Sequence, residues 1–239
     1  MLETPVTLVT GGTSGIGAAV ARNLSSRSHT VVAASRVMDD RQRSAPLVAR
    51  WHSLDVADEG SVNRVVDAIV EEYGKLDNLV HCAGILERVD VMDMSFADWR
   101  RVLAANLDGT FLVTRAVSRQ MRNQVSGSIV LLASDRGIHG LRSGAHYAAS
   151  KGAIIAYMKS LALELGALGV TVNAISPGTT DTGMARQGLS AQELEKRQRF
   201  DPLGKIGSPD DIAEIVAFLL GPARTFMTGQ LISTRMRAG

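Results

Sequence analysis

A tyrosine and a lysine four residues apart, Tyr147 and Lys151, have types and spacing suited to acid–base chemistry. In a helix, residues at positions i and i+4 lie on the same face. The pKa of a free tyrosine is about 10, and a nearby ammonium group lowers it by stabilising the phenolate. The pair therefore predicts a tyrosine that exchanges protons with a substrate. Helices also carry such pairs by chance, so the prediction needs support from the surrounding sequence.

A glycine-rich loop near the start of the chain predicts a dinucleotide site. The loop, residues 10–17 with the sequence TGGTSGIG, lies between an expected strand and an expected helix. Small residues let the backbone turn tightly and approach a pyrophosphate, and the following helix offers free N–H groups and its positive end. A structural turn also needs glycines, but dinucleotide binding requires this strand-to-helix context. We expect the cofactor contacts to include Gly11, Thr13, Ser14, Gly15, Ile16 and Gly17.

The end of the second expected strand indicates which dinucleotide binds. NAD-binding proteins usually place an acidic residue there to hold the adenosine ribose hydroxyls. Here the position is Ser35, followed by Arg36. An uncharged residue removes repulsion toward a 2′-phosphate, and an arginine can pair with that phosphate. A surface arginine after a strand would look the same. We therefore expect NADP(H), with NAD(H) as the alternative.

The elements that must position these residues alternate along the chain. Strands are expected at 6–9, 30–34, 50–54, 79–82, 129–132, 170–175 and 230–232, and helices at 15–27, 61–73, 99–122, 145–168 and 210–220. The segment between the second and third strands is short and interrupted by Pro46, so any helix there is abbreviated. Strands that are apolar on both faces and separated by helices imply a parallel sheet covered on both sides. The predicted class is α/β: one Rossmann-type, doubly wound domain over residues 1–239.

Composition excludes several classes of protein. The 239 residues are 45% hydrophobic, and 26 basic against 24 acidic side chains leave a net charge of +2. That charge gives no strong attraction to nucleic acid or anionic membranes. The apolar runs fall far short of the ~20 residues of a membrane span, and the start of the chain does not resemble a signal peptide. The single cysteine, Cys82, excludes an intramolecular disulfide. We expect a cytoplasmic protein with a small-molecule substrate, without metal, nucleic acid or membrane.

The spacing TGxxxGxG, rather than GxGxxG, is typical of one family. With the Tyr147–Lys151 pair, it makes the sequence resemble a compact, single-domain short-chain dehydrogenase/reductase from Val6 to about Gln230. The resemblance implies that Ser134, thirteen residues before Tyr147, hydrogen-bonds the substrate oxygen and that Tyr147 exchanges its proton. Lys151 would also bind the nicotinamide ribose. Asn106 would support a water-linked proton path to that lysine, or simply kink its helix; both can hold together.

The resemblance implies further contacts. Asp55, with Val56 beside it, would contact the adenine amino group, although Asp55 could equally be a helix cap. Ala83 and Gly84 would let the cofactor approach closely. The loop after the sixth strand would hold the nicotinamide carboxamide through Pro177, Gly178, Thr180 and Thr182. Residues 181–200 would form a mobile substrate lid.

Two segments depart from the family pattern. His81-Cys82-Ala83-Gly84 replaces the common Asn-Asn-Ala-Gly. We expect His81 to be a core histidine with its hydrogen bonds satisfied, and Cys82 to be a small buried residue rather than a nucleophile. Near the end, Thr234-Arg235-Met236-Arg237 stands where Val-Asp-Gly-Gly is expected, which would change a packing contact or the rim of the site.

Three functions remain open. The first is a carbonyl reductase or alcohol dehydrogenase acting on ketones, β-ketoacyl thioesters or polyketide intermediates. The second is an NAD-dependent dihydrodiol dehydrogenase, because several segments resemble 2,3-dihydro-2,3-dihydroxybenzoate dehydrogenases; Arg142 would then pair with a substrate carboxylate, unless it is a solvated loop arginine. The third is a non-catalytic nucleotide sensor, since fold does not fix function. The resemblance also implies a homodimer or homotetramer assembled through the helices at 99–122 and 145–168.

Overall fold

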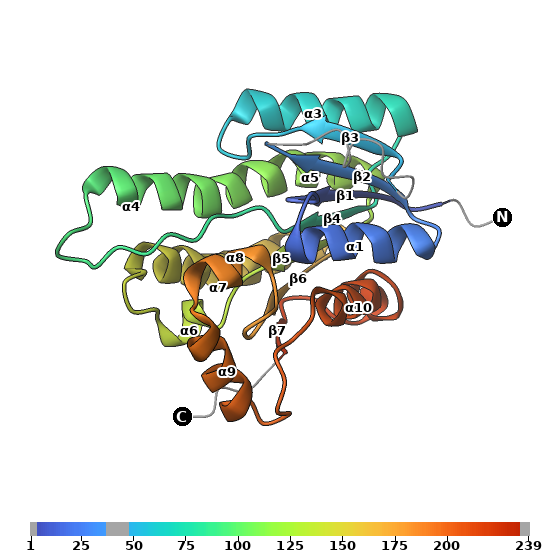
Figure 1. The fold of residues 1–239 in the computed structure, drawn as a ribbon. Helices are drawn as coiled ribbons and strands as arrows, with labels where there is room; N and C mark the ends of the chain where they lie inside the picture. Colours follow the sequence, from blue (N-terminus) through green and yellow to red (C-terminus); the bar gives the residue numbers. More distant parts are fainter. Residues whose placement is uncertain (1–3, 37–47, 235–239) are drawn as a thin grey trace.

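A seven-stranded sheet forms the centre of the computed structural model, which describes residues 4–36 and 48–234 (Figure 1). All neighbouring strands are parallel, in the order β3-β2-β1-β4-β5-β6-β7. The strands are β1 (Val6–Thr10), β2 (Thr30–Ser35), β3 (Arg50–Ser53), β4 (Asn78–His81), β5 (Gly127–Leu132), β6 (Val170–Ser176) and β7 (Leu231–Ser233). The predicted doubly wound parallel sheet is confirmed.

Helices cover both faces of this sheet, and the alternation of strand side chains feeds two separate cores. On β1, Leu8 faces the core that α3, α5 and α7 cover, whereas Val9 faces the core that α1 and α10 cover. Every residue of β1 and β5 is buried, as expected for the interior of a parallel sheet. The helices are α1 (Gly15–Ser26), α3 (Glu59–Tyr73), α4 (Phe96–Leu103), α5 (Gly109–Gln124), α6 (Arg136–His139), α7 (Ala145–Gly166), α8 (Gly183–Gly188), α9 (Ala191–Phe200) and α10 (Pro209–Leu220).

The helix expected at 99–122 is interrupted. One π-helical turn, Ala104–Asp108, joins α4 to α5, with Asn106 at its middle. The Thr110 hydroxyl donates to the Asn106 carbonyl over 2.6 Å, and the Thr114 hydroxyl donates to the Thr110 carbonyl over 2.7 Å. Such side-chain bonds compete with the regular helical ladder, and single π turns in α-helices are frequent at functional sites.

The carboxyl ends of the strands carry the loops in which ligands bind in open parallel sheets. The strand order reverses between β1 and β4, so the loops after these two strands diverge and leave a crevice. The β5 and β6 loops end at the same edge, where α6, α8 and α9 lie close to the start of α7 (Figure 1).

Two expectations fall outside the described residues: the abbreviated helix near Pro46, and Arg235-Met236-Arg237 of the unusual tail. Among the helices that the structure describes, none is long and apolar enough to cross a membrane.

Candidate active site

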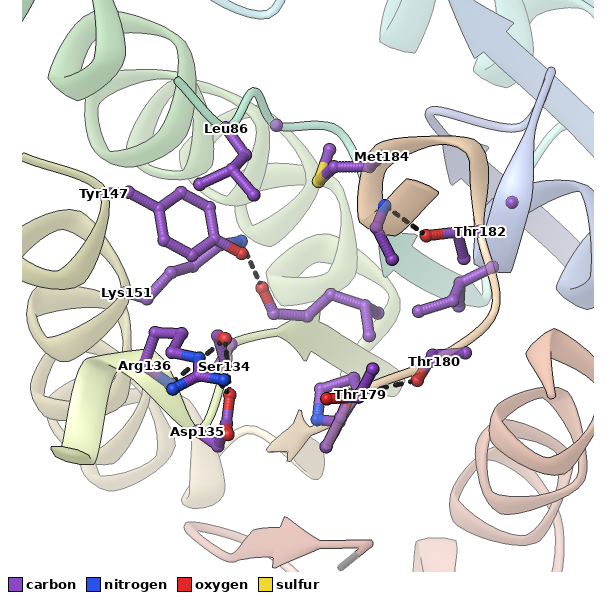
Figure 2. A pocket seen from close by; sticks show the side chains of 18 of the residues that line it. Leu86, Ser134, Asp135, Arg136, Tyr147, Lys151, Thr179, Thr180, Thr182 and Met184 are labelled. Carbon is purple, nitrogen blue, oxygen red and sulfur yellow. Dashed lines mark hydrogen bonds and ion pairs between the residues drawn. The ribbon is translucent and has the colours of Figure 1, made fainter. Parts of the chain in front are cut away.

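A cavity of about 250 Å³ opens at the carboxyl edge of the sheet (Figure 2). Its walls come from the loops after β1, β4, β5 and β6, from α7, and from the segment containing α8 and α9. The lining includes Ser14, Gly15, Ile16, Cys82, Gly84, Ser134, Tyr147, Lys151, Pro177, Gly178, Thr180 and Thr182. The structure therefore brings residues of the expected catalytic set and of the expected cofactor set to one cavity.

Ser134 follows the end of β5 by two residues. Its hydroxyl accepts a hydrogen bond from the Arg136 backbone N–H over 3.2 Å and donates to the Asp135 carboxylate over 3.3 Å. Both contacts lie within the short turn that begins α6. The turn therefore fixes the direction of the hydroxyl at the cavity wall, beside Tyr147.

Tyr147 is buried, with 8% of its surface exposed. Burial raises the pKa of this tyrosine above its ordinary value, and the neighbouring Ser134 hydroxyl acts in the opposite direction. The net shift is therefore opposite to the one expected from the sequence, because burial outweighs the effect of nearby positive charge. The lysine Nζ lies 5.9 Å from the centre of the tyrosine ring and donates a 2.6 Å hydrogen bond to the Leu132 carbonyl. Its own pKa is lowered to about 8 by burial.

Asn106 connects the loop after β4 to α7. The side chain accepts a bond from the Ile85 N–H over 2.8 Å, and its amide donates to the Ile85 carbonyl and the Ser150 hydroxyl over 3.0 and 3.1 Å. Gly84, in the loop after β4, lies close to both Asn106 and Lys151. A Cβ on it would be 3.0 Å from the Asn106 Oδ1 and 3.7 Å from the Lys151 Nζ. Asn106 thus holds the loop after β4 against α7, and a side chain at position 84 would push the Asn106 amide aside by a few tenths of an ångström.

The loop after β1 has the shape that a pyrophosphate site needs. Gly11 has a φ of +68°, and a Cβ on Gly17 would lie 2.2 Å from the Gly11 carbonyl oxygen. Both positions therefore require glycine. Ser14 precedes α1 in an extended conformation and forms no side-chain cap, so the first N–H groups of the helix remain available. This open helix start, next to the cavity, fits the binding of an anionic dinucleotide.

The end of β2 is tied to the same loop. Thr13 donates from its hydroxyl to the Ser35 hydroxyl over 3.1 Å, and the Gly11 N–H donates to the Ala34 carbonyl over 2.8 Å. Arg36 is exposed and forms no hydrogen bond or ion pair with any residue in the described ranges. Arg36 therefore stands exposed next to this end of the loop.

Asp55 is exposed and accepts a hydrogen bond from the Ala57 N–H over 3.0 Å. It is not the helix cap: Asp58 caps α3 by accepting from the Ser61 N–H over 2.6 Å. Val56 is buried against Gly109, where a Cβ would come within 2.7 Å of the valine side chain.

The loop after β6 reaches the start of α1. Thr182 caps α8 by accepting from the Ala185 N–H over 3.2 Å, and a Cβ on Gly15 would lie 3.3 Å from the Thr182 methyl. The Gly178 N–H donates to the Thr234 hydroxyl over 3.2 Å. Thr180 donates to the Gly178 carbonyl over 3.2 Å. The first residue of the unusual tail therefore supports the rim of the site.

The two residues that depart from the family pattern behave differently. Burial raises the pKa of the Cys82 thiol to about 12, which disfavours the thiolate form that a nucleophile needs at neutral pH. His81 is buried and neutral, with its pKa lowered to about 3 by burial. Its Nδ1 shares a 2.9 Å hydrogen bond with the Thr10 hydroxyl, but its buried Nε2 has no partner among the described residues. The expectation of a fully satisfied histidine is therefore only half right.

Arg142 is exposed and does not line the cavity. Three other arginines line it instead: Arg88 after β4, Arg136 at the start of α6, and Arg197 on α9. None of the three was predicted from the sequence. Arg136 could have been predicted, because it follows Ser134, an expected site residue, by two positions in the sequence. No expected site residue or motif lies close to Arg88 or Arg197 in the same way.

Comparisons with known proteins agree with this geometry. Residues 11–234 match the family model described as enoyl-(acyl carrier protein) reductase. The chain is 36% identical over 238 residues to the 3-oxoacyl-(acyl-carrier-protein) reductase FabG of Aquifex aeolicus, covering 97% of this chain and 96% of that protein. It is also 36% identical to cis-4-hydroxycyclohexanecarboxylate dehydrogenase of Sinomonas cyclohexanicum, covering 95% and 94%.

Solved structures give the same picture. NAD⁺-bound xylitol dehydrogenase superposes with a TM-score of 0.91 at 33% identity, covering 98% of each chain. ElxO with NADP bound superposes with a TM-score of 0.89 at 28% identity, covering 97% of each chain. The family model spans every described element after β1, and the relatives cover nearly the whole chain, so the protein is an oxidoreductase and belongs to the short-chain dehydrogenase/reductase family.

Proposed function

We propose that the protein is an NADP(H)-dependent oxidoreductase that interconverts a ketone and an alcohol, with Tyr147 as the acid or base. One observation carries the proposal: Ser134, Tyr147 and Lys151 line a single cavity together with the open N-terminus of α1. The names of the two relatives given above refer to an oxo group and to a hydroxyl group, which fits this reaction class.

The cofactor would be held mainly by backbone. The N–H groups at the start of α1, at Ser14, Gly15 and Ile16, would bind the pyrophosphate, and Lys151 with the loop at 177–182 would hold the nicotinamide half. When bound, the nicotinamide supplies or accepts the hydride. Arg36, exposed at the end of β2 and unpaired among the described residues, favours a 2′-phosphate. Solved relatives include both an NADP-bound and an NAD⁺-bound protein, so direct titration with NADPH and NADH is the test of this preference.

Tyr147 is suited to donate a proton. Because its pKa is raised, the phenol stays protonated at neutral pH and can protonate the substrate oxygen as it gains negative charge. Ser134, held by the Asp135–Arg136 turn, would orient that oxygen. The ammonium of Lys151, fixed on the Leu132 carbonyl, would stabilise the tyrosinate that remains. Asn106 is a positioning residue in this scheme, since its side chain holds the Ile85 loop and Ser150.

The segment 181–200 would act as the substrate lid. It contributes Met184, Leu189 and Arg197 to the cavity wall, so its position controls access to Ser134 and Tyr147. Assembly into a homodimer or homotetramer would use α5 and α7, which present the exposed apolar side chains of Phe111 and Leu163.

The test of the proposed function is the Tyr147→Phe variant. An enzyme of this mechanism should lose nearly all NADPH-dependent ketone reduction while keeping its affinity for NADPH. A nucleotide sensor would give no turnover in either protein. A dihydrodiol dehydrogenase would oxidise a cyclohexadiene diol carboxylate with NAD, and the absence of that turnover with both nicotinamides excludes it.

A further inference from the structure

We propose that the substrate carries a carboxylate close to its reacting carbonyl or hydroxyl group, and that Arg136 and Arg197, with Arg88 at the rim, bind this carboxylate. The inference rests on the proposed function, because it takes Ser134 and Tyr147 as the reacting end of the cavity. It concerns the wall of the cavity that lies opposite the loop after β1. None of the sequence motifs pointed to this wall.

Positive charge dominates the cavity wall. Four basic side chains, the three arginines and Lys151, face a single acidic one, Asp135, which leaves a net of +3 on the lining residues. The whole chain has a net charge of only +2. Positive charge is therefore concentrated in this cavity, and low-dielectric walls strengthen its attraction for an anion.

Arg136 ties this charge to the reacting centre. Its backbone N–H donates to the Ser134 hydroxyl, so the arginine and the serine belong to one turn. The side chain is 14% exposed, and its Nε lies 3.5 Å from the Asp135 Oδ1. Its two terminal nitrogens form no hydrogen bond within the described ranges, so that edge of the planar guanidinium remains for a ligand.

Arg197 approaches from α9. One of its terminal nitrogens donates to the neutral Thr179 hydroxyl over 3.2 Å. Burial, followed by the positive charges of Arg136 and Arg88, lowers the pKa of this arginine. The nearby Glu193 is engaged at the start of α9, where it accepts from the Ser190 N–H and hydroxyl over 2.8 and 3.0 Å. Arg88 forms no hydrogen bond or ion pair within the described ranges. An anion among the three would offset their mutual repulsion.

Arg136 is not placed for the cofactor. Figure 2 shows Arg136 beside Ser134 and Asp135, on the side of the cavity away from Thr182. Thr182 is the residue that approaches Gly15 at the start of α1, so the pyrophosphate end lies there. The link through Ser134 places the bound anion only a few bonds from the reacting oxygen, as in an oxo or hydroxy acid. A planar guanidinium pairs with a carboxylate or a phosphate through two parallel bonds, so the comparison with a phosphate ester below decides between the two.

The test measures binding, so it does not depend on turnover. NADPH-loaded protein is titrated by calorimetry with cyclohexanecarboxylate, with its methyl ester and with cyclohexyl phosphate. We expect the carboxylate to bind at least about tenfold more tightly than either of the others. Arg136→Gln and Arg197→Gln should each remove that advantage without changing NADPH affinity, which also shows that the variants are folded. Arg199→Gln, on the same helix but outside the cavity, is the matched control.

Three results would overturn the inference: equal binding of acid and ester, tighter binding of the phosphate, or an equal loss in Arg199→Gln. The proposed function is judged separately from the same preparations. If 4-oxocyclohexanecarboxylate methyl ester is reduced in a Tyr147-dependent manner but the acid has no advantage in binding, the carboxylate site fails and the reductase stands. If the acid binds through the arginines and neither 4-oxocyclohexanecarboxylate nor its ester is reduced, the reductase assignment fails.

Discussion

The two ends of the cavity are built in different ways. At the proposed cofactor end, backbone groups and glycines near the start of α1 would form the site, and these residues are close together in the sequence. At the substrate end, Arg88, Arg136 and Arg197 come from three separate elements and meet only in the folded chain. A site built from backbone groups needs residues at a fixed spacing in one segment, and a sequence pattern reveals that spacing. A site built from side chains needs only that segments far apart in the sequence lie side by side in the fold, which leaves no local pattern. Substitutions at four positions test this contrast.

The largest effect is expected where the two ends meet, at Tyr147. Removing its hydroxyl in Tyr147→Phe takes away the proton donor, and general acid catalysis contributes about 10²–10⁴-fold to a rate. We expect kcat for ketone reduction to fall by that factor while the Kd for NADPH changes little. Steady-state kinetics and fluorescence titration provide the two values. A variant that keeps more than about a tenth of wild-type kcat would remove Tyr147 from the mechanism.

The cofactor end should be disrupted when its backbone is crowded. In Gly17→Ala the new methyl would lie 2.2 Å from the Gly11 carbonyl oxygen, so the loop must shift away from the shape that approaches the pyrophosphate. We expect NADPH affinity to fall by roughly a hundredfold, ~2.7 kcal/mol.

Gly166→Ala is the control for crowding at Gly17, because a methyl group on Gly166, at the end of α7, would have no atom within 4 Å. It should bind NADPH like the wild type and be equally or more stable, since alanine favours the helix over glycine by about 1 kcal/mol. Equal binding by both variants would mean that the loop is not held in this shape by Gly17.

Lys151 lies between the cofactor end and the substrate end of the cavity, and the burial of its charge should lower the free energy of unfolding. Its pKa is lowered to about 8 in the folded protein, so below that pH the fold must keep a buried ammonium that the unfolded chain holds in water. Between pH 8 and about 10.5 the Lys151 amine is protonated in the unfolded chain but not in the folded one. The free energy of unfolding of the wild type therefore increases as the pH rises through this range. We expect Lys151→Met to be more stable than the wild type by about 2 kcal/mol at pH 7, with the difference shrinking toward pH 10.5.

Urea unfolding at a series of pH values measures this difference. The bond from the Lys151 Nζ to the Leu132 carbonyl is lost in the variant, which offsets part of the gain. A destabilised variant whose deficit is independent of pH would show that this bond outweighs the burial of the charge.

The smallest effect is expected at Arg36, where the cofactor end meets solvent. Arg36→Gln removes a charge that would pair with the 2′-phosphate, so NADPH should bind about tenfold more weakly, ~1.4 kcal/mol, while NADH binding is unchanged. Titration of both proteins with both nucleotides under matched salt gives the comparison. If wild-type protein binds NADH as tightly as NADPH, the preference for NADP(H) is wrong.

The fold was largely predictable because hydrophobic periodicity is local. The buried runs of β1 and β5 and the amphipathic pattern of α3 each indicate their structure within a few residues. The interruption of the helix at Asn106 was not placed by periodicity, since it depends on the Thr110 hydroxyl and on the contacts of Asn106 with Ile85. The four-residue helix α6 was missed because it is too short to show a period.

The parts of the candidate site that could be predicted are those whose residues lie close together in the sequence. The glycine loop and the pair on α7 could be identified from their spacing together with the sequence on either side. The expected role of Arg142 was not supported by position: after α6 the chain turns at Gly140 and Ser143, both with positive φ, and Arg142 between them is exposed. The pKa of Tyr147 could not be read from spacing either, because burial and the Leu132 carbonyl, both set by the tertiary fold, decide how the lysine acts.

The bond between Gly178 and Thr234 has a consequence for the synthesis of the protein. The Thr234 N–H also donates to the Ser176 carbonyl over 3.3 Å, so this residue supports the loop after β6 from both its backbone and its side chain. That loop in turn packs against Gly15 at the start of α1 through Thr182. The proposed cofactor pocket therefore depends on contacts between the first and the last described strands and the loops that follow them. A site that begins near residue 11 is completed only after residue 234 has emerged from the ribosome.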